Sequence, residues 1–236
     1  YTVEVTDSEG CVSDPQEFTL TQPDTLIATG VISDYNGFGV SCNGASDGMI
    51  ELDVTGGVEP YTFNWSNSSS DPDLTNVSAG NYSVTILCAN GCEVLIDFNI
   101  TEPEPIQITN STVESVLCFG SSDGAIGISV DGGTGVYDFQ WSNGDETEDL
   151  INISSGSYTV DVIDENDCIY QETFNVPTPN PIVIFEDINN VSCLGDDDGV
   201  INVSVSGGTP FSSAVDDYNY TWLNGVTSQN LDNLLP

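Results

Sequence analysis

Hydrophobic and polar residues alternate with a period of two along several short stretches of the chain. Residues 50–54 read Ile-Glu-Leu-Asp-Val, residues 126–130 read Ile-Gly-Ile-Ser-Val, and residues 61–65 read Tyr-Thr-Phe-Asn-Trp. This alternation predicts β-strands with one buried face, because successive side chains of a strand point to opposite faces of the sheet. No stretch shows the period of an amphipathic helix. We therefore expect an all-β fold.

Turn-forming residues separate the predicted strands. Gly56-Gly57 follows the strand at residues 50–54, and Asn90-Gly91 lies between residues 82–86 and 94–100. Asn-Gly between two alternating runs is the strongest short-range signal for a β-hairpin. Asn166-Asp167, at the matching place further along, is a weaker signal. Short strands at regular spacing predict a β-sandwich, with the aromatic residues of 61–65 in its core rather than on a sugar-stacking surface.

The sequence repeats itself with a shift of 76 residues, which places Cys42 on Cys118 without a gap. Internal repetition at such a period indicates an array of structural units. A third copy begins at Cys193 and carries about six extra residues near 211–217, and residues 1–23 match the end of a copy, with Cys11 on Cys92. The two complete copies share their glycines, aromatic residues and prolines, among them Gly48 with Gly124, Gly57 with Gly133, Tyr61 with Tyr137, Trp65 with Trp141, Asn76 with Asn152, Phe98 with Phe174 and Pro103 with Pro179.

Proline-containing segments mark the expected boundaries between the copies. They lie at residues 21–23, 101–105 and 176–181, and proline both removes strand hydrogen-bond donors and stiffens a connection. We expect the end of one repeat at residues 1–23, complete repeats at 24–103 and 104–180, and the first part of another repeat at 181–236. Short, stiff linkers predict that repeats of about 76 residues are arranged as a rod.

The charge of the chain limits its function. It has 38 acidic residues and no Lys, Arg or His, so its formal net charge is −38. Side-chain salt bridges are impossible, nucleic acid is excluded as a partner, and neither membrane insertion nor binding to an anionic membrane is expected. The common catalytic bases and amines are also missing, so we expect no catalytic residues and no enzyme. The carboxylates favour solubility and mutual repulsion along an extended array, or cation binding.

The order of motifs within each copy resembles the SprB repeat. Residues 40–48 read Val-Ser-Cys-Asn-Gly-Ala-Ser-Asp-Gly, residues 56–67 read Gly-Gly-Val-Glu-Pro-Tyr-Thr-Phe-Asn-Trp-Ser-Asn, and residues 82–92 and 101–103 complete the pattern. Such repeats occur in very large surface proteins of Bacteroidetes, including a gliding-motility adhesin. The resemblance implies tandem Ig-like β-sandwiches, export to the cell surface by the type IX system, and a role in adhesion or motility. It supplies no catalytic residues, and two features depart from it: Cys88, and the extra residues near 211–217.

The seven cysteines predict disulfides and an oxidising compartment. Cys42 precedes Cys92 by 50 residues and Cys118 precedes Cys168 by the same number, which favours pairing within each repeat. This pairing fastens the loop after Cys42 to the Asn90-Gly91 hairpin. The alternative pairs neighbouring repeats, as Cys11–Cys42, Cys92–Cys118 and Cys168–Cys193, and leaves Cys88 free.

A calcium site is a second expectation, because clustered oxygen ligands on loops suit Ca²⁺. The candidate ligands are Asp47 with Asn90, Asp123 with Asp164, Asn166 and Asp167, and Asp196 with Asp198. The simpler interpretation is that Asp47 and Asp123 form Asx turns, with Gly48 and Gly124 at positive φ. Asp24-Thr25-Leu26 also resembles an O-glycosylation triplet, which makes Thr25 a candidate modification site.

Three functions fit these observations. The first is a structural, adhesive segment of a large secreted surface protein, acting as a stiff acidic spacer in attachment or gliding, with the neighbouring repeats as its partners. The second is a carbohydrate-binding module that binds surface polysaccharide through its loops or residues 211–217. The third is an accessory region of a secreted hydrolase. The chain starts inside a strand pattern without a signal peptide, so we expect an internal segment of a longer secreted protein.

Overall fold

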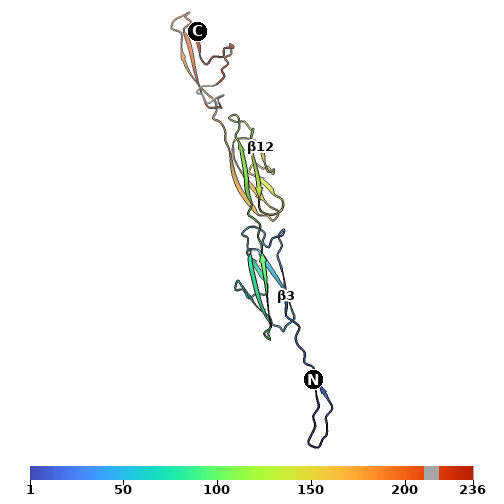
Figure 1. The fold of residues 1–236 in the computed structure, drawn as a ribbon. Coiled ribbons are helices and arrows are strands. Elements are labelled where there is room, and N and C mark those ends of the chain that lie inside the picture. The colour runs from blue at the N-terminus through green and yellow to red at the C-terminus, as the bar shows by residue number, and fades with distance from the viewer. Residues whose placement is uncertain (210–217, 236) are drawn as a thin grey trace. The chain divides into compact units, whose positions relative to one another are not determined.

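The computed structural model describes residues 1–209 and 218–235, and the chain divides into two units, residues 1–105 and 106–236. Every regular element of the described residues is a β-strand (Figure 1). The expected all-β fold class is confirmed. In the described part of the chain, no helix is long and apolar enough to cross a membrane.

The first unit contains a complete β-sandwich. Its strands are β3 (Ile27–Ile32), β4 (Gly48–Thr55), β5 (Thr62–Trp65), β6 (Leu74–Val77), β7 (Gly80–Leu87) and β8 (Glu93–Ile100). They form two antiparallel sheets, one in the order β3-β4-β6 and the other in the order β5-β7-β8. The strands at residues 50–54, 61–65 and 82–86 that the alternating pattern predicted are therefore present.

The core of this sandwich lies between the two sheets. Ile50 from one sheet and Val84 and Ile86 from the other are fully buried, each with an exposed fraction of 0%. Trp65 packs near Phe98 with their ring centroids 6.1 Å apart. Burial of an aliphatic side chain contributes roughly 1.5–3 kcal/mol, so these inward positions stabilise the sandwich. The aromatic residues belong to the core, as predicted.

The second unit repeats this architecture. Its strands β9 (Gln107–Glu114), β10 (Gly124–Asp131), β11 (Asp138–Trp141), β12 (Leu150–Ile153), β13 (Gly156–Ile163) and β14 (Ile169–Val176) form sheets in the orders β12-β10-β9 and β11-β13-β14. Val160 and Val162 are fully buried, and Trp141 lies 6.1 Å from Phe174 between ring centroids. The shift of 76 residues therefore relates equivalent positions of the fold.

A β-bulge explains the repeated Asp-Gly and Asn motifs. The pairing of β4 with β6 shifts between Gly48 and Met49, and that of β10 with β12 shifts between Gly124 and Ala125. Across the bulge, Asn76 and Asn152 both have φ 56°, a left-handed conformation that Asn tolerates well. The described glycines with positive φ include neither Gly48 nor Gly124, so the predicted positive φ is wrong at both. The reason is close backbone approach: a Cβ on Gly48 would lie 2.6 Å from the carbonyl oxygen of Val77.

The predicted hairpins form in both repeats. Cys88 N–H donates to the carbonyl oxygen of Cys92 at 2.9 Å, and Gly91 takes φ 86° at the tip of the β7–β8 hairpin. In the β13–β14 hairpin, Asp167 occupies the place of Gly91 with φ 62°. Asp accepts positive φ more readily than most residues, which explains how the weaker Asn166-Asp167 signal still gives the same turn.

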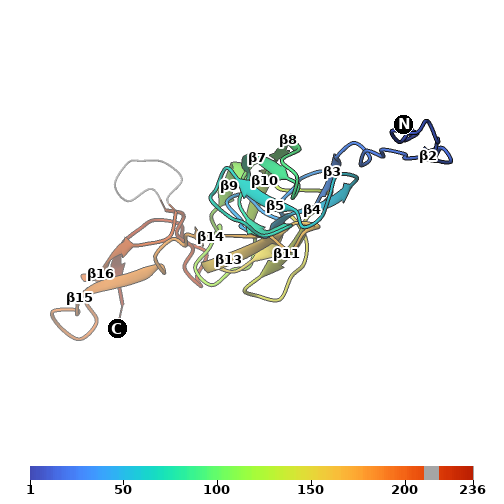
Figure 2. The ribbon, with the colours of Figure 1, turned by 90° about the horizontal axis from the view of Figure 1, so that it is seen from below.

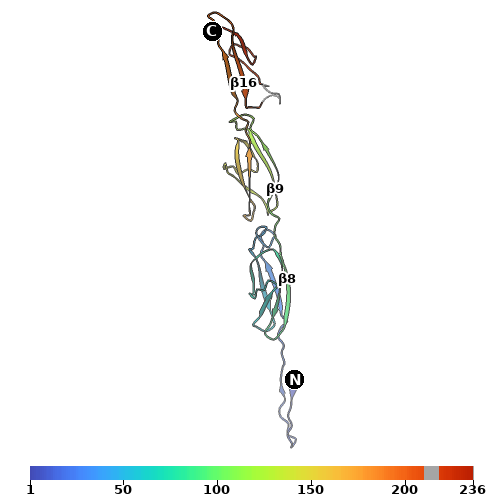
Figure 3. The ribbon, with the colours of Figure 1, turned by 90° about the vertical axis from the view of Figure 1, so that its left-hand side faces the viewer.

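The two ends of the chain form smaller sheets. At the N-terminus, β1 (Thr2–Val3) pairs with β2 (Gln16–Glu17) as a hairpin. At the C-terminus, β15 (Val183–Asn189), β16 (Gly199–Ser206) and β17 (Leu231–Leu234) form one sheet in that order. Figure 2 shows β15 and β16 side by side in orange, and Figure 3 labels β16 again from another side. This sheet is the counterpart of β9-β10-β12.

Candidate functional site

The cysteines pair differently from both predicted schemes. Cys88 and Cys92 form a disulfide with an S–S distance of 2.12 Å. Neither Cys42 nor Cys168 is free, whereas Cys11, Cys118 and Cys193 are free and exposed. The pairs Cys42–Cys92 and Cys118–Cys168 are therefore wrong. The alternative set is wrong as well, since each of its pairs contains a free cysteine or Cys92.

The loop of Cys42 and the hairpin of Cys92 lie at opposite ends of the sandwich. The loop leads directly into Gly48, the first residue of β4, whereas Gly57, which follows β4, lies against the hairpin. A Cβ on Gly57 would be 3.0 Å from Cys92 Sγ. Eight residues of extended strand span about 26 Å, far beyond the Cα separation of about 7 Å that a disulfide tolerates. The equal spacing of the two cysteine pairs is a consequence of the sequence repeat, and it does not bring the cysteines of a pair close together in space.

The loop aspartates close the loop before β4 and its counterparts. Asp47 Oδ1 accepts a hydrogen bond from Ser41 N–H at 3.1 Å, Asp123 Oδ1 from Leu117 N–H at 3.0 Å, and Asp198 Oδ1 from Ser192 N–H at 2.9 Å. Each bond joins residues six positions apart, so these are loop-closing bonds rather than the predicted Asx turns, which span two residues.

Hydrogen bonding lowers the pKa of these carboxyl groups. For Asp123 the Ser121 hydroxyl is the main cause, followed by Leu117 N–H, and both lower the pKa. For Asp198 the Ser192 N–H and hydroxyl lower the pKa. For Asp47 burial raises the pKa, but the hydroxyl and N–H of Ser41 outweigh burial, and the net shift is downward. The ionised form is the one that holds the loop.

Asp164 has a structural role that the sequence did not reveal. It is buried, with an exposed fraction of 4%. Its Oδ2 accepts from the N–H and the hydroxyl of Thr134 at 2.9 and 3.1 Å, and its Oδ1 accepts from Asn166 N–H and Cys168 N–H, both at 2.9 Å. Four donors compensate the burial of this carboxylate. Asp7, which accepts from Glu9 N–H and Cys11 N–H at 2.9 Å, repeats the arrangement in the N-terminal hairpin.

The predicted calcium ligands do not come together. Asp47 lies before β4 and Asn90 in the hairpin at its far end, and Asp123 and Asp164 are separated along β10 in the same way. Asn166 and Asp167 belong to the hairpin of Asp164. Asp196 and Asp198 both accept hydrogen bonds from Ser192. Residues 1–209 and 218–235 contain no group of three or more acidic or cysteine side chains arranged to hold a metal ion.

The segment that leaves the first sandwich is fastened to it. The carbonyl oxygen of Thr101 accepts from Gly39 N–H at 2.9 Å and from Val40 N–H at 3.2 Å. The carbonyl oxygen of Pro103 accepts from Asn43 Nδ2 at 3.0 Å. The Glu102 carboxylate accepts from Gly44 N–H at 2.7 Å, and the ring of Pro103 is fully buried. Four residues before β4 therefore hold the linker residues 101–103: Gly39, Val40, Asn43 and Gly44.

Two further candidate sites were predicted from the sequence, Thr25 and residues 211–217. Thr25 is exposed, next to the buried Leu26, and its modification remains a prediction. The extra residues 211–217 lie outside the described residues.

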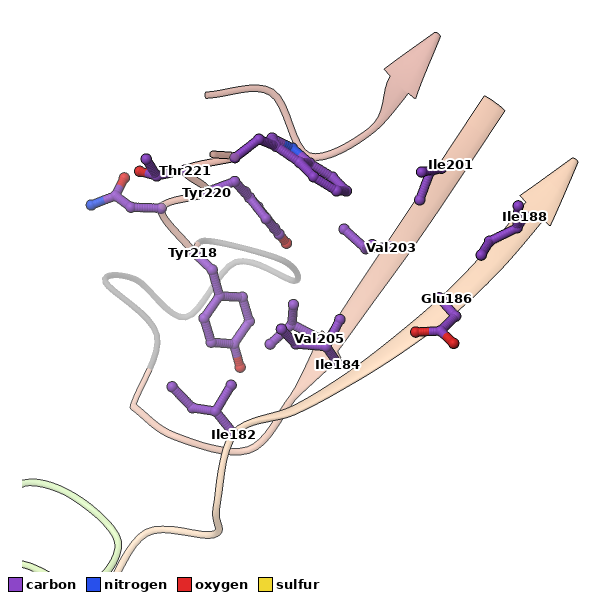
Figure 4. Close-up of a pocket in the computed structure, with 12 residues that line it drawn as sticks. Ile182, Ile184, Glu186, Ile188, Ile201, Val203, Val205, Tyr218, Tyr220 and Thr221 are labelled. Carbon is purple, nitrogen blue, oxygen red and sulfur yellow. The ribbon is translucent and has the colours of Figure 1, made fainter. Parts of the chain in front are cut away.

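A pocket of about 540 Å³ lies on the inner face of the C-terminal sheet. In Figure 4, Ile184, Val203 and Val205 on the strands face Tyr218 and Tyr220. The remaining lining residues are Ile182, Glu186, Ile188, Ile201, Asn219, Thr221 and Trp222. The counterparts of Ile201 and Val203 in the second repeat are Ile126 and Ile128, which have exposed fractions of 0% and 6%. The pocket therefore lies at the position that corresponds to the core of the second repeat.

These observations define the chain as a tandem array of β-sandwich repeats. A family model of the SprB repeat matches residues 40–70, 110–146 and 186–227. These three segments are therefore similar to the SprB repeat, in agreement with the resemblance that the motif order predicted.

The remaining comparisons are with whole proteins. Comparison with curated proteins gives no match. Among solved structures, the chain is similar to Sidekick-1 immunoglobulin domains 1-5, with 13% identity, a TM-score of 0.34, and coverage of 88% of this chain and 52% of that chain. It is also similar to the N-terminal eight Ig domains of Down Syndrome Cell Adhesion Molecule, with 10% identity, a TM-score of 0.38, and coverage of 100% and 46%. The chain spans about half the length of each.

Proposed function

We propose that this chain is a non-enzymatic spacer segment of an extracellular, adhesion-type surface protein. Its SprB-type repeats form stiff, acidic units that carry a binding region away from the cell, or transmit movement, during attachment or gliding. The observation that carries this proposal is the fastened linker at residues 101–103.

A spacer needs connections that do not swing freely. Carbonyl oxygens of Thr101 and Pro103 and the side chain of Glu102 are all hydrogen-bonded to the loop at residues 39–44. Because Pro103 is also buried, bending at this point breaks hydrogen bonds and exposes apolar surface. Both effects favour a fixed linker over a flexible one.

The charge supports the same proposal. A chain with 38 acidic residues and no basic ones has repeats that repel one another, and this repulsion opposes folding back of the array. Screening reduces the repulsion with a Debye length of about 10 Å at 0.1 M salt. The acidic surface also keeps an exposed array soluble.

The aromatic residues favour the spacer over the carbohydrate-binding alternative. Trp65 and Trp141 each have an exposed fraction of 4%, and their Nε1–H groups donate to the carbonyl oxygens of Asp71 and Thr147 at 2.9 and 2.8 Å. A sugar-binding surface uses exposed aromatic rings, whereas these rings are core residues with satisfied polar atoms. These buried tryptophans also give no support to the third function, an accessory region of a secreted hydrolase.

Small-angle X-ray scattering of the chain tests the proposal. Asn43→Ala combined with Glu102→Ala removes two of the bonds that fasten the linker, and we expect a shorter maximum dimension and a broader distribution of distances. The matched control combines Asn64→Ala with Glu51→Ala, two exposed strand positions, and should scatter like the unmodified chain.

Two results would contradict the spacer. One is an unmodified chain that scatters as a flexible string, with no change in the linker variant. The other is direct binding of the purified chain to immobilised polysaccharide, which would support the carbohydrate-binding alternative instead.

A further inference from the structure

Asn43 and Gly44 form an Asn-Gly pair in the loop before β4. An asparagine loses its side-chain amide most readily when glycine follows it, because the main-chain nitrogen of glycine is unhindered and attacks the neighbouring side-chain carbonyl carbon. Gly44 has φ 74°, and a Cβ built on it would meet nothing within 4 Å. The loop therefore leaves room for this reaction.

The linker holds the two groups that take part in the reaction. Asn43 Nδ2 donates to the carbonyl oxygen of Pro103 at 3.0 Å, and Gly44 N–H donates to the Glu102 carboxylate at 2.7 Å. Ring closure requires the Asn43 side chain to turn toward the Gly44 nitrogen, which must also lose its proton. Each change breaks a hydrogen bond to the linker, so the fastened linker opposes the reaction.

The pair and its carboxylate partner occur together in only one of the three corresponding loops. Phe119 in the second repeat and Leu194 in the third repeat stand at the position of Asn43, and neither has an amide to lose. Thr178 stands at the position of Glu102 in the linker after the second repeat. The reaction and its control by the linker are therefore specific to the joint at residues 101–103.

We propose that Asn43 is a deamidation site that becomes reactive when the linker opens. Once the bonds to Pro103 and Glu102 are broken, the Gly44 nitrogen forms a bond to Asn43 Cγ. The bond between Cγ and Nδ2 breaks, and Nδ2 leaves as ammonia with the proton that Gly44 N–H gives up. Water, the only co-reactant, then opens the cyclic imide at either carbonyl, and residue 43 becomes aspartate or isoaspartate.

Deamidation makes the opening permanent. The amide that donates to the carbonyl oxygen of Pro103 is replaced by a carboxylate, which cannot donate and which repels the nearby Glu102 carboxylate. The chain has no Lys, Arg or His to compensate the added charge. This inference rests on the proposed function: in a spacer under load, the joint that opens most often is the one that loses its stiffness for good.

Mass spectrometry of chymotryptic peptides measures the reaction at each asparagine after the full chain is incubated at mildly alkaline pH. Glu102→Ala removes the acceptor of Gly44 N–H and should accelerate deamidation of Asn43 by roughly tenfold or more, the factor expected for loss of a hydrogen bond to a charged group. Glu104→Ala is the matched control, because it removes an exposed carboxylate from the same linker. It should leave the rate at Asn43 unchanged.

The Asn143-Gly144 pair is an internal reference for every one of these chains. It lies in a turn of the second repeat, where Gly144 N–H donates to the carbonyl oxygen of Trp141 at 2.9 Å. This bond does not involve the linker, so the rate at Asn143 should be the same in the unmodified chain and in both variants.

The consequence of deamidation is tested with Asn43→Asp, which has the same side chain as one product. Amide hydrogen exchange should show loss of protection at Val40 and Gly44, whose N–H groups donate to the linker in the unmodified chain. Asn64→Asp, at an exposed strand position, adds the same charge away from the linker and should leave both N–H groups protected.

Equal rates at Asn43 in the unmodified and Glu102→Ala chains would overturn the proposal. So would a slower reaction in the Glu102→Ala chain, since the carboxylate would then act as a base that promotes deamidation. Protection that persists in the Asn43→Asp chain would overturn the permanent opening. Small-angle X-ray scattering separates these failures from failure of the spacer: an extended unmodified chain with equal rates contradicts only this inference, whereas a chain that scatters as a flexible string contradicts the spacer itself.

Discussion

Cys88 and Asp164 occupy the same position in the hairpins of consecutive repeats, and each fastens the residue four positions later. Cys88 is bonded to Cys92 through a disulfide, and Asp164 Oδ1 accepts the N–H of Cys168 at 2.9 Å. Asp7 does the same for Cys11 at 2.9 Å in the N-terminal hairpin. One position of the fold therefore uses either a covalent bond or a carboxylate to hold the same turn.

This equivalence predicts that Asp can replace Cys88. Changing Cys88 and Cys92 together to Ser removes the disulfide and should lower the stability of the first repeat by about 2 kcal/mol, the value for closing a loop of this size. Cys88→Asp combined with Cys92→Ser should regain part of that loss, because the carboxylate accepts the N–H groups of residues 90 and 92. Differential scanning calorimetry measures the difference, with the second repeat as an internal reference. Equal melting of the Ser and Asp variants would contradict the shared role.

Asp164 should be needed for the β13–β14 hairpin. Asp164→Ala removes the acceptor of the buried N–H group of Thr134 and of the partly buried N–H groups of Asn166 and Cys168, a change that costs about 2–4 kcal/mol. Amide hydrogen exchange should show loss of protection at these three groups. Asp138→Ala, at an exposed position of β11, controls for the lost charge and should leave their protection unchanged. Unchanged exchange in the Asp164→Ala chain would show that the turn forms without the carboxylate.

The strands were predictable because their signal is local. Neighbouring residues alone indicate which side chains of a strand face the core, as the alternation at residues 50–54 and 82–86 shows. They also indicate the hairpin, through the Asn90-Gly91 turn between two strands. The repeat of 76 residues then carried the same prediction to the second sandwich. The SprB-type motif order was also readable, because it depends only on sequence.

The sites were less predictable because they depend on which loops share an end of the sandwich. The prediction placed Cys42 and Cys92 together, whereas β4 separates them. The spacing that could have indicated the hairpin bond was Cys88-x-x-x-Cys92 beside Asp164-x-x-x-Cys168 and Asp7-x-x-x-Cys11. The need for Gly48 came from the carbonyl oxygen of Val77 across the bulge, a contact between residues far apart in the sequence.

Two glycines of β10 should respond oppositely to the same substitution. A Cβ on Gly124 would lie 2.8 Å from Val176 Cγ1, 3.1 Å from the carbonyl oxygen of Ile153 and 3.2 Å from that of Glu114. Gly124→Ala should therefore destabilise the second repeat by about 1–3 kcal/mol. A Cβ on Gly127 meets the movable hydroxyl of Thr112 at 2.8 Å, and Gly127→Ala should be neutral or stabilising by up to about 1 kcal/mol, because alanine restricts the unfolded chain. Urea unfolding compares the two, and an equal effect would show that the bulge adjusts.

Calcium should act on this chain only as a general counter-ion. The candidate ligands Asp47 and Asn90 lie at opposite ends of β4, so no shared site exists for them. At equal ionic strength, Ca²⁺, Mg²⁺ and Na⁺ should therefore give the same relation between salt and melting temperature, each reducing repulsion within a chain of net charge −38. A rise specific to Ca²⁺ would mean that a site forms from other oxygen ligands, since a bound ligand stabilises the folded state by mass action.

The loop aspartates should make stability fall in acid. Hydrogen bonds from the Ser121 hydroxyl and Leu117 N–H hold the pKa of Asp123 below its ordinary value. The folded-state pKa is thus lower than the unfolded one, so this stabilisation is fully present above about pH 4 and is lost as the pH falls through the folded-state pKa. Protonation of the other carboxylates relieves their mutual repulsion and therefore raises stability in acid. For this reason the measurement compares the unmodified chain with variants that each lack one carboxylate. Asp123→Asn keeps an acceptor oxygen but does not titrate, and its urea midpoint should fall less steeply below pH 4 than that of the unmodified chain. Asp138→Asn, at an exposed position, controls for removal of one charge, and a slope that matches the Asp123→Asn chain would contradict a specific contribution from the loop.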